Sequence, residues 1–389
     1  MIMTERRYDV DWLRIIAMLA VFFFHCTRLF DPESWHLKNP AQSEVLFISM
    51  RGIIWPWVME LFFLLSGIGT WYALKSRNAG AYLWERVKRL LIPLYTMGLF
   101  VLLPIQFFFE RYTNSGYDGS FWQLMPHYFK GLRFPNLTQY PATLLPMPFA
   151  GHLWFLQYLF LISFLTLPLL LYLKSENGKA YIAKLADWCY KPGGIFLFII
   201  PLSVTLITLR ILIKGRFTWA DLIWYAIFFV IGYMMAADKH FMAGIKRHQW
   251  ACLVMWIAGF MSMGLIIQVA GYDPYPGKES YSLVFVLFQI IWSTTSWSAV
   301  VFVLGLGAKY LNTNNKFLNY GNEAVLPCYL FHQTIILCFG WYVICWDMGI
   351  TLKLLVTAIV SFSIIMILYN LVVRHFNMIR FFFGMPPKK

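Results

Sequence analysis

The sequence contains little charge. Only 13% of its 389 residues are Asp, Glu, Lys or Arg, whereas 60% are hydrophobic, and the mean hydropathy is +0.61. A soluble globular domain carries about 25% charged residues. The composition therefore excludes a soluble globular protein and predicts a polytopic membrane protein.

Cysteine is also scarce and follows no pattern. The six cysteines fall mostly inside apolar runs, and no two of them are spaced as C-x-x-C. This argues against a disulfide framework and against a zinc site, so we expect no metal. Buried apolar thiols are the simplest interpretation.

Acidic residues are fewer than basic residues, 18 against 32, which gives a net charge of +14. The basic residues lie in short stretches between apolar runs and form no basic patch, which argues against a nucleic-acid partner. With the N-terminus placed inside, twenty lysines and arginines fall in inner segments and nine in outer segments. This bias predicts that both termini are cytoplasmic.

Long apolar runs are what the sequence has in abundance. Ten are long enough to cross a bilayer, at residues 9–30, 53–74, 90–109, 152–173, 194–213, 219–236, 250–271, 281–306, 324–345 and 352–373. No cleavage site follows the first run, so we expect that span to be retained. We predict an all-α bundle of about ten transmembrane helices forming one membrane-embedded domain over residues 1–389, with kinks or helix starts at Pro93, Pro104, Pro168, Pro201 and Pro327.

Only one connection between the runs is long, from Glu110 to Gly151, and it is rich in aromatic residues and proline. A connection of this length is typical of a lid or a binding surface. An amphipathic segment resting on the membrane interface, anchored by Trp122 and Tyr128, is an equally good interpretation.

The first apolar run carries Arg14 near one end and His25 near the other. On an α-helix, eleven positions separate two residues by about 16 Å and leave them nearly in line on one face. Ionisable groups are costly in hydrocarbon, so a pair of them in one span is a functional-site hypothesis by default.

Two more polar residues are expected on the outer side of the membrane, at a depth similar to that of His25. Glu60 lies in the outer half of the second run, and His152 lies at the outer mouth of the fourth. Glu60 could orient His25 as a general base. Unrelated hydrogen bonds within a packed bundle are the alternative.

A basic group, Arg86, Lys88 and Arg89, lies at the inner mouth of the third run. Arg86 and Arg89 share one helix face, and such a pair of guanidinium groups suits phosphate. The alternative is that all three simply obey the positive-inside rule.

Three other features have both a structural and a functional interpretation. His332 is an intramembrane histidine, either a satisfied core group or a ligand. Ser66 and Gly67 indicate close helix packing through small residues. Trp35 and His36, in the first outer connection, could face a substrate.

Taken together, these residues resemble the acyltransferase 3 family of integral membrane O-acyltransferases. The likeness consists of Arg14-x10-His25, ELFFLLSG at 60–67, Arg86-x-x-Arg89, GHLWFL at 151–156 and PCYLFHQ at 327–333. Within the family, the sequence is most similar to the glucan biosynthesis protein C group, through Trp35-His36, GHLWFL, YLFH at 329–332 and the IRFFFGMPP ending.

The resemblance implies that a cytoplasmic acyl donor, usually acyl-coenzyme A, delivers its acyl group to a hydroxyl of a carbohydrate on the outer face. Acyl-CoA would be a substrate, and no cofactor would be bound permanently. Arg14 and His25 would be the essential pair, with Arg14 binding or positioning the donor. His25 would act as general base or carry the acyl group covalently. A salt bridge from Arg14 to Asp11 is the structural alternative.

The expected site therefore has two ends. Arg86, Lys88 and Arg89 would hold the donor phosphates inside. The acceptor, such as a periplasmic glucan or an exported polysaccharide, would meet a set of outer residues, namely His152, Trp154, Trp35, His36 and His332. A succinyl group follows only from the likeness to the glucan biosynthesis protein C group, and an acetyl group is the alternative. The expected location is a bacterial inner membrane.

Two other functions are compatible with the sequence. A transporter or flippase for a glycan or lipid-linked substrate would suit ten spans with intramembrane charges, although we find no paired repeats. A membrane sensor or scaffold, in which His25 is only a core group, is the other.

Overall fold

A computed structural model of the chain describes residues 7–132, 140–141, 151–274 and 280–388. Within these ranges it contains helices and no β-strand. The α-helices are α1 (Tyr8–Thr27), α2 (Glu44–Ile53), α3 (Val58–Ser76), α4 (Ala79–Arg86), α5 (Leu103–Asn114), α6 (Phe121–Lys130), α7 (Trp154–Leu165), α8 (Leu167–Lys174), α9 (Glu176–Tyr190), α10 (Ile199–Leu212), α11 (Trp219–Ala237), α12 (His240–Ala270), α13 (Leu283–Tyr310), α14 (Lys316–Val343), α15 (Ile350–Leu368) and α16 (Asn377–Phe382). Five short segments are π-helical or 3₁₀-helical: η1 (Val87–Leu91), η2 (Leu94–Leu102), η4 (Gly151–Leu153), η5 (Gly194–Phe198) and η6 (Tyr369–Val373).

The predicted all-α membrane bundle is confirmed. Among the described residues, nine helical stretches are long and apolar enough to cross a bilayer, and the bent pair formed by Gly151–Leu165 and Leu167–Lys174 makes ten if it counts as one span. This pair bends by 51°. Pro168 lies in the first turn of α8, where it lacks the N–H that would continue the helix, which explains the bend.

The second span differs from its predicted bounds. It begins earlier, with the separate helix α2, and α2 and α3 together extend from Glu44 to Ser76. Ser43 caps α2 by accepting a hydrogen bond from the amide of Leu46. Pro56 lies between the two helices and interrupts the backbone hydrogen bonding there.

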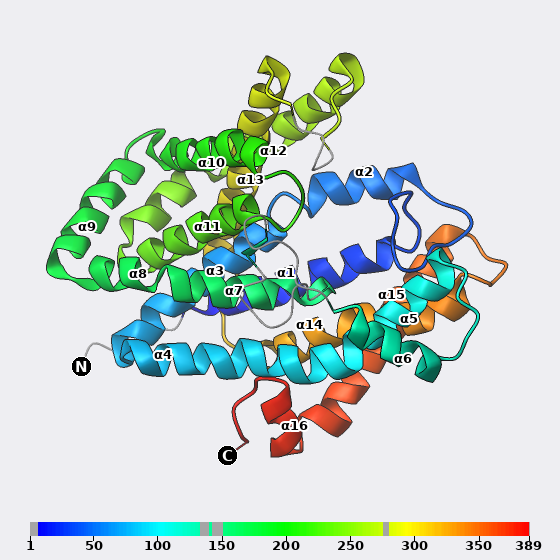
Figure 1. The fold of residues 1–389 in the computed structure, drawn as a ribbon. Helices are drawn as coiled ribbons and strands as arrows, with labels where there is room; N and C mark the ends of the chain where they lie inside the picture. The colour runs from blue at the N-terminus through cyan, green and yellow to red at the C-terminus, as the bar shows by residue number, and fades with distance from the viewer. Residues whose placement is uncertain (1–6, 133–139, 142–150, 275–279, 389) are drawn as a thin grey trace.

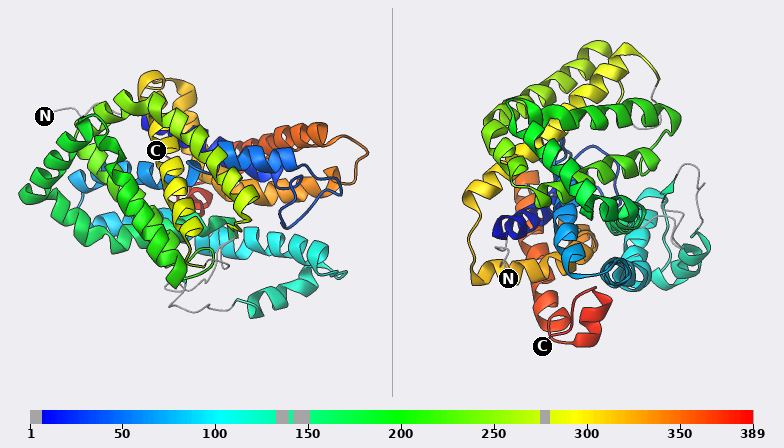
Figure 2. Two further views of the ribbon diagram at one scale, coloured as in Figure 1. Left: turned by 90° about the horizontal axis from the view of Figure 1, so that it is seen from above. Right: turned by 90° about the vertical axis from the view of Figure 1, so that its left-hand side faces the viewer.

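The third span is one long rod, drawn in cyan along the lower side of the molecule in Figure 1. It extends from Ala79 to Asn114, and the π-helical segments η1 and η2 lie on either side of Pro93. A π-helical turn widens a helix and often marks a functional position. The right-hand view of Figure 2 looks nearly along this rod, which packs against α7 and α14.

Helix α1 lies inside the bundle and packs against α3, α13, α14 and α15 (Figure 1). We call the end of the bundle at which α1 begins the Tyr8 side, and the end at which α1 finishes the Thr27 side. Arg14 is nearer the Tyr8 side and His25 is nearer the Thr27 side, as the helical spacing predicts.

The long connection after the third span is described only in part. Residues 133–139 and 142–150 lie outside the described residues. In the described part, Ser120 and Gln123 form a capping box that starts α6, and the Tyr128 hydroxyl donates to the carbonyl of Leu99 at 3.1 Å. Trp122 is 79% exposed. Helix α6 therefore docks on the third span, and its role as lid or interfacial anchor stays a prediction.

Two glycines allow α3 and α11 to cross with their backbones in contact. A Cβ at Gly67 would overlap the carbonyl oxygen of Phe229, and a Cβ at Gly232 would overlap that of Leu64. Small residues permit such a close approach between membrane helices. The close packing that Ser66 and Gly67 predict is thus confirmed, and the crossing joins the α9–α13 group of helices to the rest of the bundle.

Gly67→Ala and Gly232→Ala should each destabilise the protein by about 1–3 kcal/mol, because the added methyl group overpacks a backbone contact. The midpoint of thermal unfolding of the detergent-purified protein measures this loss. Gly264→Ala is the matched control, since a Cβ there meets no described atom within 4 Å. Equal midpoints for Gly67→Ala and Gly264→Ala would contradict the close approach.

Candidate functional site

A cavity of about 560 Å³ opens beside Arg14, between α1, α3, the third span, α7 and α14. Arg77, Glu85, Arg86 and Arg89 line its Tyr8-side end. Its far end is lined by aromatic and apolar side chains, which include Phe62, Phe155 and Tyr329. The cavity thus leads from a charged mouth to an apolar interior.

The mouth carries more positive than negative charge. Glu85 is the single carboxylate among the described residues that line it, and it pairs with Arg89 at 3.2 Å and with Arg77 at 3.5 Å. Arg86 donates a hydrogen bond to the Thr70 hydroxyl at 2.6 Å. Guanidinium groups in this number suit a ligand that carries phosphates.

Lys88 lies apart from this mouth. It does not belong to the residues that line the cavity, in contrast to Arg86 and Arg89. Two positions along a helix turn a side chain to a different face, which explains the separation. We therefore do not include Lys88 in the donor site.

Arg14 lies midway along the cavity and makes the salt bridge to Asp11 as well. Its Nη1 is 3.5 Å from Asp11 Oδ1, and its Nη2 donates to the carbonyl of Leu65 at 3.3 Å. Gly69 faces the guanidinium, since a Cβ there would lie 3.0 Å from Nη2. Arg14 therefore faces the cavity and is held between α1 and α3.

Tyr329 connects the far end of the cavity to the histidines. Its hydroxyl donates to the carbonyl of His152 at 2.6 Å, and its own carbonyl accepts from Nδ1 of His332 at 2.6 Å. A side chain that lines the cavity thus contacts two of the predicted site residues.

Three histidines from distant parts of the sequence lie in a row, which we call the histidine column: His25 of α1, His332 of α14 and His152 of η4. The ring centroids of His25 and His332 are 4.8 Å apart, and those of His332 and His152 are 5.1 Å apart. Within the described residues, no group of three or more His, Cys, Asp or Glu side chains could hold a metal. The column places three imidazoles, which can donate and accept protons, side by side.

The partners of the ring nitrogens indicate where each proton lies. Nδ1 of His25 is 2.9 Å from the carbonyl of Val21, which can only accept, so Nδ1 carries the proton and the Nε2 lone pair remains available. Nε2 of His152 donates to the carbonyl of Leu330 at 3.1 Å, and its Nδ1 accepts from the amide of Gln106 at 3.0 Å. His25 thus presents a basic nitrogen, whereas both nitrogens of His152 are engaged.

Glu60 does not orient His25 in this structure. Its Oε1 accepts from the indole N–H of Trp224 at 3.1 Å, and its Oε2 has no hydrogen-bond partner among the described residues. The carbonyl of Val21, not Glu60, holds His25. The alternative interpretation, in which the two residues serve separate contacts, describes the geometry better.

The remaining predicted residues lie in two places. Trp35 is near His25, with ring centroids 6.2 Å apart, and the adjacent His36 pairs with Glu110 at 3.1 Å. Trp154 instead packs on Phe217 and Tyr225, with ring centroids 5.2 and 5.4 Å away. Trp35 and His36 therefore border the column on the Thr27 side, and Trp154 belongs to a neighbouring aromatic cluster.

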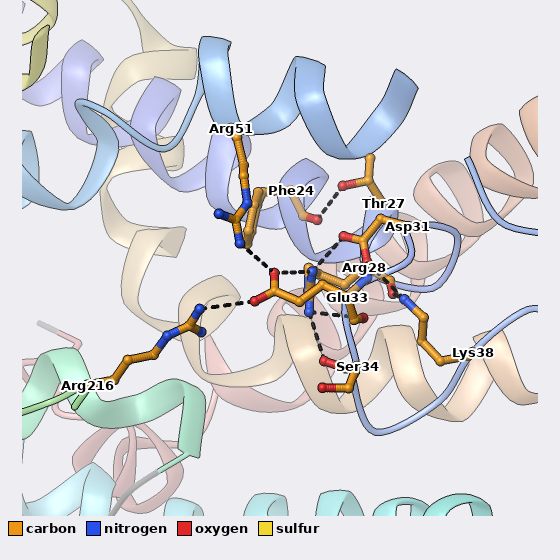
Figure 3. A network of polar contacts seen from close by, with 9 residues as sticks. All are labelled: Phe24, Thr27, Arg28, Asp31, Glu33, Ser34, Lys38, Arg51 and Arg216. Carbon is orange, nitrogen blue, oxygen red and sulfur yellow. Dashed lines mark hydrogen bonds and ion pairs between the residues drawn. The ribbon is translucent and has the colours of Figure 1, made fainter. Parts of the chain in front are cut away.

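Sequence analysis did not identify a charged network on the Thr27 side, which Figure 3 shows. The carboxylate of Glu33 accepts hydrogen bonds from Arg28 at 2.8 Å and from Arg216 at 3.1 Å, and it forms an ion pair with Arg51 at 3.2 Å. These three arginines come from the end of α1, from α2 and from the loop before α11. The network thus anchors the loop that carries Trp35 and His36. Because acidic residues are scarce in this sequence, Glu33 could have been singled out as a partner for the surrounding arginines.

The environment of Glu33 changes its acidity. Burial alone would raise the pKa of this carboxyl, but the nearby guanidinium groups of Arg28, Arg51 and Arg216 together lower the pKa below its usual value. The side chain is only 9% exposed, so water screens these ion pairs weakly. Glu33 is consequently ionised in the folded protein at neutral pH.

Comparison with known proteins identifies relatives of the whole chain. A family profile described as an acyltransferase domain matches residues 7–370. The glucans biosynthesis protein C of Salmonella typhi is 24% identical over 99% of this chain and 96% of its own length. The protein of the same name from Escherichia coli strain K12 is 24% identical over 87% of this chain and 84% of its own. No solved structure matches the chain.

Glu33→Gln should lower the stability of the folded protein by about 1–3 kcal/mol at neutral pH, because it removes the charge that three arginines share. A carboxyl with a lowered folded-state pKa stabilises the protein above its unfolded pKa, about 4.3, and loses this effect as the pH falls through the folded value. The gap in unfolding midpoint between wild type and Glu33→Gln should therefore close below about pH 4.

Glu176→Gln is the control for this experiment, since Glu176 forms an exposed surface pair with Lys179. Exposed pairs contribute about 0–1 kcal/mol, so its midpoint should follow that of wild type at every pH. A gap between wild type and Glu33→Gln that does not change with pH would contradict the assignment.

Proposed function

The chain belongs to this acyltransferase family, and we propose that it transfers an acyl group, such as succinyl or acetyl, from acyl-CoA to a hydroxyl of a carbohydrate. One observation carries the proposal. A single cavity begins among arginines, passes Arg14 and ends at Tyr329, which hydrogen-bonds to both His332 and His152. Acyl-CoA matches these two ends, because it carries phosphates, which suit the arginines, and an acyl thioester at the end of a flexible arm, which could reach Tyr329.

The orientation follows from charge. The excess of lysine and arginine in the segments of the Tyr8 side favours that side as cytoplasmic. CoA would then enter from the cytoplasm, and the acceptor would reach the Thr27 side from outside. The bacterial relatives support an inner-membrane location, and their printed names support a glucan or a related exported polysaccharide as the acceptor.

In the proposed mechanism, each residue has one task. Arg86 and Arg89 bind the CoA phosphates, and Arg14 positions the arm of the donor in the cavity. Nε2 of His25 removes the proton of the acceptor hydroxyl as its oxygen attacks the thioester carbonyl. The C–O bond forms and the C–S bond breaks, so CoA leaves as a thiol. Trp35 and His36 would contact the sugar beside His25.

An acyl-histidine intermediate would use the same nitrogen. We propose direct transfer because Nδ1 of His25 is held by a backbone carbonyl within its own helix, which suits a base that stays in place between turnovers. A protein mass increase equal to one acyl group, found after acid quenching and mapped to His25, would favour the covalent route instead.

His25→Ala should lower acyl transfer by about 10²–10⁴-fold, since it removes the proposed general base. The measurement is transfer of radiolabelled acyl groups from acyl-CoA to glucan in membrane vesicles that contain equal amounts of inserted protein. His127→Ala is the control, because His127 is exposed on α6. Full activity of His25→Ala would show that His25 is not the general base, and the absence of acyl transfer by the wild-type protein would instead support a sensor or scaffold.

Arg86→Glu and Arg89→Glu should each raise the KM for acyl-CoA about tenfold or more while the KM for the acceptor changes little, because a charge-assisted contact to phosphate is lost. Lys88→Glu is the matched control. It reverses the same charge within one turn of the same helix, but at a residue that does not line the cavity. Equal effects of the arginine changes on both KM values, or an equal effect of Lys88→Glu, would argue against phosphate binding at this mouth.

A further inference from the structure

One atom of the histidine column lacks a partner. His332 is fully buried, and its Nδ1 donates to the carbonyl of Tyr329 at 2.6 Å. Its Nε2 has no hydrogen-bond partner among the described residues. A buried polar atom left without a partner costs about 1–3 kcal/mol. Such an atom in a native protein requires an explanation.

The surrounding residues do not supply the missing partner because they are engaged with one another. Gln106 donates to His152 and to Thr334, and it accepts from Gln333. The groups that face His332 are the ring of His152 from η4, the ring of His25 from α1 and its neighbours on α14, all of them uncharged when the imidazoles are neutral. Among the described residues, no carboxylate faces His332 to hold a proton there.

The hydrogen bonds of His25 and His332 explain why Nε2 of His332 has no partner among the described residues. Both rings donate Nδ1–H to a carbonyl of their own helix, to Val21 and to Tyr329. Each ring therefore offers a lone pair at Nε2, and two lone pairs cannot form a hydrogen bond with each other. One added proton makes the two nitrogens complementary. The ring centroids, 4.8 Å apart at an interplanar angle of 72°, bring the two rings within reach.

We propose that His25 and His332 form a pair that shares one proton during catalysis, with His332 as the positioning residue that accepts a hydrogen bond from the His25 imidazolium. This inference rests on the proposed function. The hydroxyl proton of the acceptor passes to Nε2 of His25 and is shared with Nε2 of His332 while the C–O bond forms. It is returned to the sulfur of CoA as the C–S bond breaks, and both rings are neutral again.

Two substitutions at one position separate this role from a structural role. The amide of Asn reaches the place of Nδ1, so His332→Asn keeps the bond to Tyr329 and loses the acceptor at Nε2. The amide of Gln reaches the place of Nε2, so His332→Gln keeps an acceptor there and loses the bond to Tyr329. If the two rings share a proton, His332→Gln should be more active than His332→Asn. If His332 acts only through its bond to Tyr329, His332→Asn should be the more active variant.

The experiment measures kcat, both KM values and the unfolding midpoint of the full chain in vesicles, with radiolabelled succinyl-CoA or acetyl-CoA as donor and gluco-oligosaccharide as acceptor. We expect His332→Asn to lower kcat about 10–100-fold with little change in either KM, because the interaction exists only once His25 is protonated. His332→Gln should recover at least part of this loss. Combined with His25→Ala, His332→Asn should cause no further loss, since it acts through His25.

Each other outcome overturns the proposal. These outcomes are wild-type kcat in His332→Asn, His332→Asn more active than His332→Gln, or losses that follow the unfolding midpoint or the KM values. His127→Asn, on an exposed helix, controls for the loss of an imidazole. If the wild-type protein transfers no acyl group, the proposed function fails, and if His25→Ala keeps full activity, the role of His25 as base fails together with this inference. If His25→Ala is inactive and His332→Asn is fully active, only this inference fails.

Discussion

Polar side chains at membrane depth must find their partners within the protein, because hydrocarbon offers none. Most of those in this chain do. Gln106 donates to both His152 and Thr334, and the Tyr329 hydroxyl donates to the backbone carbonyl of His152. Several buried polar atoms of the described residues have no partner, and one of them lies beside the ring of His25. Nε2 of His332 is the clearest case in the described part of the chain.

Helix α1 joins the two halves of the site. It places Arg14 on the cavity and His25 beside His332, so donor and acceptor chemistry are related through one rigid element. A helix fixes the separation of two side chains better than a loop does. The bundle then closes around α1 through α3 and α14. The crossing of α3 with α11 at Gly67 and Gly232 holds this arrangement to the other group of helices.

The Glu33 network lies on the Thr27 side of the bundle, where it holds a loop in place. Three arginines from three segments converge on one carboxylate, so the loop beyond α1 is tied to α2 and to the start of α11. Several partners order one side chain for a smaller entropy cost per contact than separate pairs would. As a result, Trp35 lies in a defined position near His25. The Thr27 side is therefore held by ion pairs, and the Tyr8 side opens into the cavity.

The sequence alone determined the membrane class, the ten apolar spans and the family, because each depends on local composition or on motifs read along one helix. Arg14 and His25 could be related in the same way, since helical spacing is fixed. Only the tertiary structure decided which distant residues meet. It brought His332 and His152 to His25, linked Glu60 to Trp224 and separated Lys88 from the cavity. These outcomes depend on how helices rotate and pack against one another, and apolar periodicity specifies a buried face without specifying its neighbour.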